Sequence, residues 1–337
     1  MRKALKRNAI ALGVGAALVT AGGAWLWAAQ PWAPPVELVE PGAGGSPIRL
    51  PELVGNFYPG VGPAAGGGRR PAILLLGGSE GGLGAAADGQ ARLLAKEGFA
   101  VLVLAYYRLP GQPQRFELIP LETFTRALDW LKARDGVDPA RLAIMGTSKG
   151  AEAVLLVASR RADISAVVAA VPSQVAWQGF DWSFAPVTTS SWSERGKPVA
   201  YLPITTVGWD GDIYGPALAE AAKHPEAAIP VERIAAPVLL LCGEADKLWP
   251  SCPMARAVKA RRDGAKSGRA TTLLAYPDAG HFGVGPALPA GQDVPTMITM
   301  LGGTKEGNVA ARADGWPRTI AFLKQALAPS ADMENNR

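Results

Sequence analysis

From residue 71 onward, short apolar runs alternate along the chain with segments in which apolar positions recur at helical spacing. The short apolar runs are typical of strands that are buried on both faces. Strands that alternate with helices predict an α/β fold, with a mostly parallel central sheet and helices on both of its faces. The expected strands are 72–76, 100–105, 142–145, 166–171, 238–242 and 272–276, and the expected helices are 85–97, 121–134, 149–160, 252–262 and 315–327.

Two segments depart from this alternation. Residues 31–70 are rich in Pro and Gly, which indicates a linker with one or two short strands. Residues 172–215 have no clear period, and a segment of this length without its own elements is usually a functional insertion over a site. We therefore expect an N-terminal segment (1–30), a linker (31–70), an α/β domain (71–328) with a cap-like insertion (172–215), and a tail (329–337).

Tryptophans are concentrated in the expected cap. Trp177, Trp182, Trp192 and Trp209 all lie there, and Trp249 follows the strand predicted at 238–242. We interpret these five residues as candidates for substrate binding in an apolar acyl or aromatic pocket. Ordinary packing of a lid on the sheet is the alternative that the sequence leaves open.

The charge is concentrated at the N-terminus. The chain of 337 residues carries 34 Lys and Arg against 29 Asp and Glu, a net charge of +5. Arg2, Lys3, Lys6 and Arg7 supply four of these five charges, and no acidic residue precedes Glu37. Because the rest of the chain is close to neutral, the charge pattern argues against a nucleic-acid-binding protein.

The same four cations stand directly before an uncharged run from Ala9 to Ala29. Such a run is long enough to cross a bilayer as a helix, and Trp25, Trp27 and Trp32 suit its interface with water. We expect a membrane anchor, with a cleaved signal sequence as the alternative. The positive-inside rule then places the body on the extracytoplasmic side, which is the periplasm in a Gram-negative bacterium.

Cysteine usage gives no disulfide framework. The chain contains two cysteines, Cys242 and Cys252. We interpret them as two partly buried thiols, and a single bridge in an oxidising compartment remains the alternative.

A G-x-S-x-G motif follows the strand predicted at 142–145. Gly146-Thr147-Ser148-Lys149-Gly150 leads from this strand into a predicted helix, the context that gives the motif its meaning. The turn has to be so sharp that only glycine fits beside it, which raises the serine hydroxyl above the sheet at a helix N-terminus. Ser148 is therefore the candidate nucleophile.

A serine hydroxyl needs a general base, and the chain contains two histidines. In the α/β-hydrolase order the acid and then the histidine follow the serine. His224 precedes every strand that could supply the acid, so His281 is the candidate base. The acid is expected after the strand at 238–242, where Asp246 is preferred to Glu244. Asp278 lies too near His281 in sequence.

An oxyanion hole completes such a site. The backbone N–H of Lys149 is one expected donor, and its side chain is expected to be solvated. The second donor is expected from the loop Gly77-Gly78-Ser79-Glu80-Gly81-Gly82, at Ser79 or Glu80. A phosphate-binding role for this loop is disfavoured, because it lacks the Gly-Lys-Ser/Thr ending of a P-loop.

These motifs resemble a known family. Gly146 to Glu152, the run Asp246-Lys247-Leu248-Trp249-Pro250-Ser251 and Ala279-Gly280-His281 are similar to the C-terminal hydrolase domain of acyl-CoA thioester hydrolases and bile acid-CoA:amino acid N-acyltransferases. Leu76–Gly82 and Gly302-Gly303-Thr304 also fit. The resemblance covers about residues 70–328 and implies an α/β-hydrolase with Ser148, Asp246 and His281 as triad. The acyltransferase branch uses cysteine as nucleophile, so Ser148 resembles the hydrolytic branch.

The sequence thus predicts a serine hydrolase that cleaves an acyl thioester or carboxylic ester through an acyl-enzyme, with no cofactor or metal. A small-molecule acyl thioester or ester is the expected partner, and the membrane is contacted through the N-terminal segment. Export of the body favours a thioester or ester other than a coenzyme A derivative. A dienelactone-hydrolase-like or peptidase-like enzyme, or a catalytically silent membrane-tethered binding protein on the same fold, remains an alternative.

Overall fold

The central sheet is built from strands that pair mostly in parallel. The computed structural model describes residues 33–62, 68–208, 211–265, 269–289, 291 and 293–329. Within these residues eight strands form one sheet in the order β1-β2-β4-β3-β6-β7-β10-β11. Its strands are β1 (Ser46–Leu50), β2 (Leu53–Tyr58), β3 (Arg70–Leu76), β4 (Ala100–Ala105), β6 (Val137–Thr147), β7 (Ala166–Ala170), β10 (Val238–Gly243) and β11 (Thr271–Tyr276). β2 pairs antiparallel with β1 and β4, and the strands from β4 to β11 pair in parallel, which confirms the predicted fold class.

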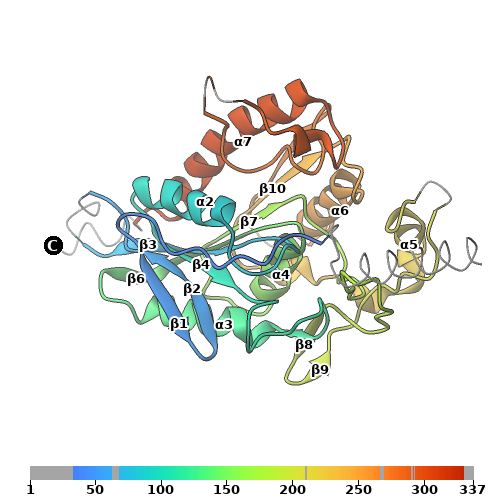
Figure 1. Cartoon of the computed structure of the whole chain (residues 1–337), viewed down its shortest axis with the longest axis horizontal. Helices are drawn as coiled ribbons and strands as arrows, with labels where there is room; N and C mark the ends of the chain where they lie inside the picture. The colour runs from blue at the N-terminus through green and yellow to red at the C-terminus, as the bar shows by residue number, and fades with distance from the viewer. Residues whose placement is uncertain are drawn as a thin grey trace, which may run out of the picture.

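Helices cover both faces of this sheet (Figure 1). Alternate side chains of a strand point to opposite faces. In β3, Leu74 and Leu76 pack in the same apolar cluster as α3, α4 and α6, whereas Ile73 and Leu75 pack in the cluster of α2 and α7. The helices are α2 (Ala85–Lys96), α3 (Leu121–Lys132), α4 (Lys149–Ala158), α5 (Gly215–Ala219), α6 (Ser251–Gly264) and α7 (Lys305–Ala326), with short 3₁₀ helices η2 (Ala221–Lys223), η3 (Pro225–Ala227), η4 (Val231–Arg233) and η5 (Thr296–Thr299).

The last helix is longer than the sequence predicted. α7 begins at Lys305 rather than at residue 315, and the Thr304 side chain caps it by accepting a hydrogen bond from Gly307 N at 2.9 Å. Gly315 and Pro317 both lie inside the helix. Both residue types usually interrupt a helix, so the sequence pattern indicated a start where the helix in fact continues.

The segment interpreted as a linker contributes to the sheet. β1 and β2 lie within residues 31–70, and β2 pairs with β4. Asn56 and Tyr58 of β2 donate hydrogen bonds of 2.8 and 2.7 Å to the buried Asp88 carboxylate on α2. The sheet therefore begins before residue 71.

The expected cap, residues 172–215, is largely irregular. It carries β8 (Trp192–Glu194) and β9 (Lys197–Pro198), which form a small second sheet with β5 (Ile119–Pro120). Strands of two or three residues are too short to show a period in the sequence. Residues of the cap and of the segments after it form a third apolar cluster, made of Val175, Trp177, Leu202, Ala217, Ala227, Trp249 and Met254.

The N-terminal segment predicted as an anchor or signal (1–30) lies outside the described residues, as does the tail from residue 330. None of the helices that the structure does describe is long and apolar enough to cross a membrane.

Candidate active site

The turn between β6 and α4 holds Ser148 in a strained backbone. Ser148 has φ of 58° and directly precedes the first residue of α4. A Cβ at Gly146 would lie 2.4 Å from the carbonyl oxygen of Gly150, and a Cβ at Gly150 would lie 2.1 Å from the carbonyl oxygen of Gly77. Both flanking positions therefore require glycine, which is the physical basis of the G-x-S-x-G pattern.

Asp246 and His281 are joined across two neighbouring loops. Asp246 follows β10 and His281 follows β11, and these parallel strands end at the same edge of the sheet. The Oδ2 atom of Asp246 lies 2.9 Å from Nδ1 of His281. The Oδ1 atom accepts the backbone N–H groups of Leu248 and Trp249 at 2.9 and 3.3 Å. With both side chains almost fully buried, this pair can hold the imidazole in one orientation.

A third segment ties the two loops together. The carbonyl oxygen of Leu301 accepts the N–H of Lys247 and the N–H of His281, each at 3.1 Å. Gly302 and Gly303 follow with positive φ values of 96° and 73°. A Cβ at Gly302 would lie 2.0 Å from the Ala245 carbonyl, so the close approach of these loops depends on this glycine.

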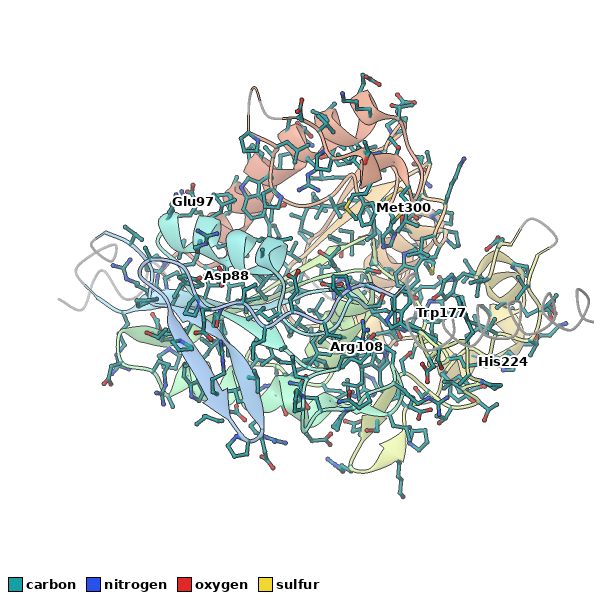
Figure 2. The ribbon with its side chains drawn as sticks, in the orientation of Figure 1. Asp88, Glu97, Arg108, Trp177, His224 and Met300 are labelled. Carbon is teal, nitrogen blue, oxygen red and sulfur yellow. A yellow bond between two sulfur atoms is a disulfide. The ribbon has the colours of Figure 1, made fainter. Side chains whose placement is uncertain are left out.

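The other residues weighed as acid or base lie outside this constellation. Glu244 pairs with Arg256, and Asp278 is exposed. His224 lies in the region of α5 and the short 3₁₀ helices, where its Nδ1 atom is 3.3 Å from Glu226 (Figure 2).

The prediction that the Lys149 side chain is solvated is wrong. Its Nζ atom lies 2.6 Å from Oε2 of Glu152, and both side chains are buried. The ammonium also lies 5.2 Å from the ring centre of Phe116 and 5.4 Å from that of Trp192. Burial lowers the pKa of Lys149 and raises the pKa of Glu152, and the mutual attraction of the pair opposes both shifts.

Glu152 also connects the helix after Ser148 with the cap. Its Oε1 atom accepts the backbone N–H of Trp177 at 2.9 Å and the indole N–H of Trp192 at 2.5 Å. With Lys149 on Oε2, both oxygens of this buried carboxylate are satisfied. Sequence reasoning missed Glu152, although its spacing of three residues from Lys149 on a helix was a visible signal.

The predicted tryptophans occupy different places. Trp192 is fully buried against Glu152, and Trp177 and Trp249 flank Tyr214, with ring centres 4.9 and 5.5 Å from it. Trp249 is buried and lies 5.9 Å from the His281 ring, so its contact with substrate stays a prediction. Trp182 lies against the loop after β3. Trp209 lies outside the described residues.

The loop after β3 approaches Ser148 at Gly78. A Cβ built on Gly78 would lie 3.4 Å from the Ser148 Cβ. The Gly78 N–H donates to Oε1 of Glu80 at 3.0 Å, so the Glu80 carboxylate folds back onto the loop although the residue as a whole is exposed. Surrounding protein atoms raise the pKa of Glu80, against the lowering effects of its own backbone N–H, of the Gly78 N–H and of His281. Ser79 and Glu80, which the sequence indicated as candidate oxyanion-hole donors, lie in this loop. The sequence pattern did not identify Gly78 as the residue of the loop that approaches Ser148.

The interpretation of Cys242 and Cys252 as free thiols is wrong. The two residues form a disulfide, with Cα atoms 5.1 Å apart. Cys242 lies near the end of β10 and Cys252 in the first turn of α6. The bond therefore closes the loop that carries Asp246, a proximity that the sequence does not show.

Comparison with known proteins adds to this geometry. Residues 119–329 match the model of the family described as BAAT / Acyl-CoA thioester hydrolase C terminal. The chain belongs to this family. The matched residues of the BAAT / acyl-CoA thioester hydrolase domain include Ser148, Asp246 and His281.

The sequence matches to individual relatives cover most of the chain. Acyl-coenzyme A thioesterase 5 of Mus musculus is 28% identical over 299 residues, covering 86% of this chain and 66% of the relative. Acyl-coenzyme A thioesterase 1 of Rattus norvegicus is 31% identical over 268 residues, covering 76% of this chain and 60% of the relative. Acyl-coenzyme A amino acid N-acyltransferase 1 of Mus musculus is 29% identical over 306 residues, covering 87% of this chain and 67% of the relative. The chain thus spans less than two thirds of the thioesterases that it matches.

Solved structures share the fold. A bacterial heroin esterase superposes with a TM-score of 0.53 at 18% identity, covering 85% of this chain and 86% of the esterase. A puromycin-hydrolysing peptidase of Mycobacterium tuberculosis gives a TM-score of 0.57 at 16% identity, covering 86% of this chain and 41% of the peptidase. At these identities the likeness shows the α/β-hydrolase fold that the family domain adopts.

Proposed function

We propose that this protein is a serine hydrolase that cleaves acyl thioesters or carboxylic esters through an acyl-enzyme. The observation that carries the proposal is the buried Asp246–His281 hydrogen bond at the sheet edge that also carries the strained Ser148. Membership of a family that includes acyl-CoA thioesterases supports a thioester as the bond that is cleaved.

The first half-reaction forms the acyl-enzyme. With Nδ1–H donated to Asp246, the Nε2 atom of His281 accepts the Ser148 hydroxyl proton as Oγ bonds to the substrate carbonyl carbon. Asp246 remains ionised and stabilises the imidazolium. Backbone N–H groups of Lys149 and of the loop after β3 stabilise the negative charge on the carbonyl oxygen. As the tetrahedral intermediate collapses, its bond to the leaving thiolate or alkoxide breaks, and His281 returns the proton to that leaving group.

The second half-reaction releases the acyl group. A water molecule transfers a proton to Nε2 of His281 and its oxygen bonds to the acyl carbon. The same N–H groups stabilise the second oxyanion. Collapse of this intermediate breaks the bond to Oγ, releases the carboxylic acid and returns the proton to Ser148.

The direct test compares Ser148→Ala with the matched variant Ser165→Ala, because the Ser165 hydroxyl donates to the Ala140 carbonyl away from the site. A panel of acyl-CoAs and p-nitrophenyl esters of increasing chain length provides the substrates. We expect Ser148→Ala to lose at least about 10⁴-fold in kcat, with an unchanged melting temperature. Retained turnover in Ser148→Ala would refute the assignment, and wild-type protein that hydrolyses no substrate would favour a silent binding protein.

We further propose that the catalytic body acts on the extracytoplasmic side of a membrane. The cations and the uncharged run before residue 30 support this location, and a disulfide is the form that cysteines take in oxidising compartments. Coenzyme A is not expected there, so another acyl thioester or ester would be the natural substrate. N-terminal sequencing of protein from the membrane fraction tests the anchor: Met1 or Arg2 supports it, and a start after residue 20 supports a cleaved signal.

A further inference from the structure

Four consecutive carbonyl groups of the loop after β3 face side chains of other segments. These are the carbonyls of Gly77, Gly78, Ser79 and Glu80. Their donors come from Tyr106-Tyr107-Arg108, directly after β4, and from Trp182 in the cap. β4 is the parallel neighbour of β3, so its carboxyl end lies beside this loop.

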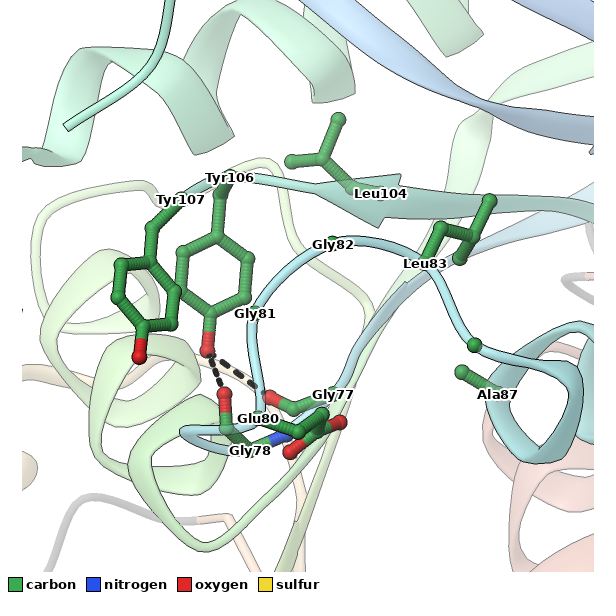
Figure 3. Close-up of a pocket in the computed structure, with 11 residues that line it drawn as sticks. Gly77, Gly78, Glu80, Gly81, Gly82, Leu83, Ala87, Leu104, Tyr106 and Tyr107 are labelled. Carbon is green, nitrogen blue, oxygen red and sulfur yellow. Dashed lines mark hydrogen bonds between the residues drawn. The ribbon is translucent and has the colours of Figure 1, made fainter. Parts of the chain in front are cut away.

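Tyr106 holds the first two carbonyls. Its hydroxyl donates to the Gly77 carbonyl at 3.0 Å and to the Gly78 carbonyl, so that one proton is shared between them (Figure 3). The ring is buried and contacts Phe116 and Phe124 edge-on. Burial raises the pKa of Tyr106 well above its ordinary value, so the hydroxyl keeps its proton across the pH range of an assay.

Tyr107 and Trp182 hold the third carbonyl together. The Tyr107 hydroxyl donates to the Ser79 carbonyl at 2.9 Å. The indole N–H of Trp182 lies 2.6 Å from the Tyr107 hydroxyl and 3.2 Å from the same carbonyl. Arg108 donates to the Glu80 carbonyl at 2.8 Å. The cap thus reaches the loop through the indole of Trp182.

These contacts determine where the N–H groups of the loop point. In a trans peptide the C=O and the following N–H point in opposite directions, and no described peptide bond is cis. Fixing the carbonyls of Gly77, Gly78 and Ser79 therefore directs the N–H groups of Gly78, Ser79 and Glu80 away from the tyrosines. The Gly78 N–H meets the Glu80 carboxylate, which interacts electrostatically with His281, so this is the side of the active site.

The cavity beside the loop is not a substrate pocket. It has a volume of about 10 Å³, enough for about one water molecule, and is lined by the glycines of the loop together with Tyr106 and Tyr107 (Figure 3). The partners of the two hydroxyls are the loop carbonyls named above.

We propose that Tyr106, Tyr107 and Trp182 are positioning residues, which hold the backbone of this loop so that the Ser79 N–H faces the oxyanion. The N–H groups of Gly78 and Glu80 donate instead to the Glu80 carboxylate, which fixes the loop from its other side. The proposal rests on the proposed hydrolase function. It assigns Trp182 a catalytic purpose other than contact with substrate, and it makes docking of the cap a condition for a complete oxyanion hole.

The test uses Tyr106→Phe, Tyr107→Phe, their double variant and Trp182→Phe, each of which removes hydrogen-bond donors and keeps a ring. We expect kcat to fall about 10-fold in each single variant and about 100-fold in the double variant, with KM within about 3-fold of wild type. Tyr201→Phe is the control, since the Tyr201 hydroxyl donates to the Thr188 carbonyl of the cap.

Two further readouts separate positioning from a general structural role. A thionoester presents sulfur, a weak acceptor, to the oxyanion hole, so the ratio of oxoester to thionoester rates should fall in the Tyr and Trp variants and not in Tyr201→Phe. Hydrogen exchange of peptides covering residues 77–82 should become faster in the double variant. An unchanged rate ratio, or an unchanged exchange rate, would overturn the proposal. If wild type hydrolyses no ester at all, the proposed function fails, and the exchange rates alone still decide whether these side chains hold the loop.

Discussion

The carboxylate of Asp246 and the imidazole of His281 lie 2.9 Å apart between Oδ2 and Nδ1, with almost no solvent access to either side chain. Because the second oxygen of Asp246 accepts two backbone N–H groups, the carboxylate cannot rotate away from the ring without losing them. In the tautomer of the proposed mechanism, with the proton on Nδ1, the acceptor is then Nε2, on the side of the ring opposite Asp246.

Replacing the acid should disable the base without unfolding the protein. Asp246→Asn keeps the shape of the side chain but no longer fixes the imidazole tautomer or stabilises its charged form, so we expect kcat to fall by about 10⁴-fold. The matched control is Asp278→Asn, an exposed acid three residues from His281. Steady-state kinetics on one activated ester would measure both, and a greater loss in Asp278→Asn would contradict the assignment of Asp246.

Removing one partner of the buried Lys149–Glu152 pair should destabilise the folded protein strongly. Glu152→Gln leaves the Lys149 ammonium buried without its counter-ion, a change that typically costs about 3–5 kcal/mol. Glu194→Gln breaks the exposed pair with Arg160 and should cost no more than about 1 kcal/mol. Urea unfolding of the two variants checks the contrast. Equal losses would show that Lys149 is not held as an ion pair.

The disulfide should stabilise the loop that carries Asp246. Closing a loop between residues ten apart in sequence lowers the entropy of the unfolded chain by the equivalent of about 3 kcal/mol at 25 °C. We expect Cys242→Ala/Cys252→Ala to lose about that much stability and to unfold identically with and without dithiothreitol. Wild-type protein should lose stability on reduction. A wild type that is indifferent to the reductant would contradict the presence of the bond.

Glu80 should make stability depend on pH in a predictable direction. Although Glu80 is exposed as a residue, the protein atoms packed around its carboxylate raise its pKa above the ordinary value of 4.5. Between the two values the folded state therefore binds more protons than the unfolded state. Stability contributed by the protonated form is then lost as pH rises from about 4.5 through the folded-state pKa. We expect Glu80→Gln to gain melting temperature relative to wild type at pH 8, with a smaller difference at pH 4. A difference that is the same at both pH values would contradict this account.

Local signals made much of the fold predictable. β4 has the bounds that its apolar run indicated, because a strand buried on both faces needs apolar residues at every position. The serine turn was predictable because only glycine fits beside it. The proximity of Asp246 and His281 was predictable from their places after two consecutive strands, since the strands of a parallel sheet end at one edge.

What the sequence did not show depends on contacts between distant segments. The burial of Lys149 requires the cap to cover it with Trp192, 43 residues away by number. The disulfide requires the end of β10 and the start of α6 to approach, and the role of Tyr106 requires β3 and β4 to be neighbours. None of these contacts between distant segments produces a periodic pattern of residues in the sequence.

The central claim is that Ser148 is the nucleophile, and active-site titration with a fluorophosphonate tests it most directly. The fraction of protein carrying the adduct on the peptide that contains Ser148 is measured by mass spectrometry, together with the remaining hydrolase activity at each time. The account predicts that activity falls in direct proportion to adduct on Ser148, reaching zero at one adduct per chain. Activity that persists in fully labelled protein, or is lost while Ser148 remains unmodified, would contradict it.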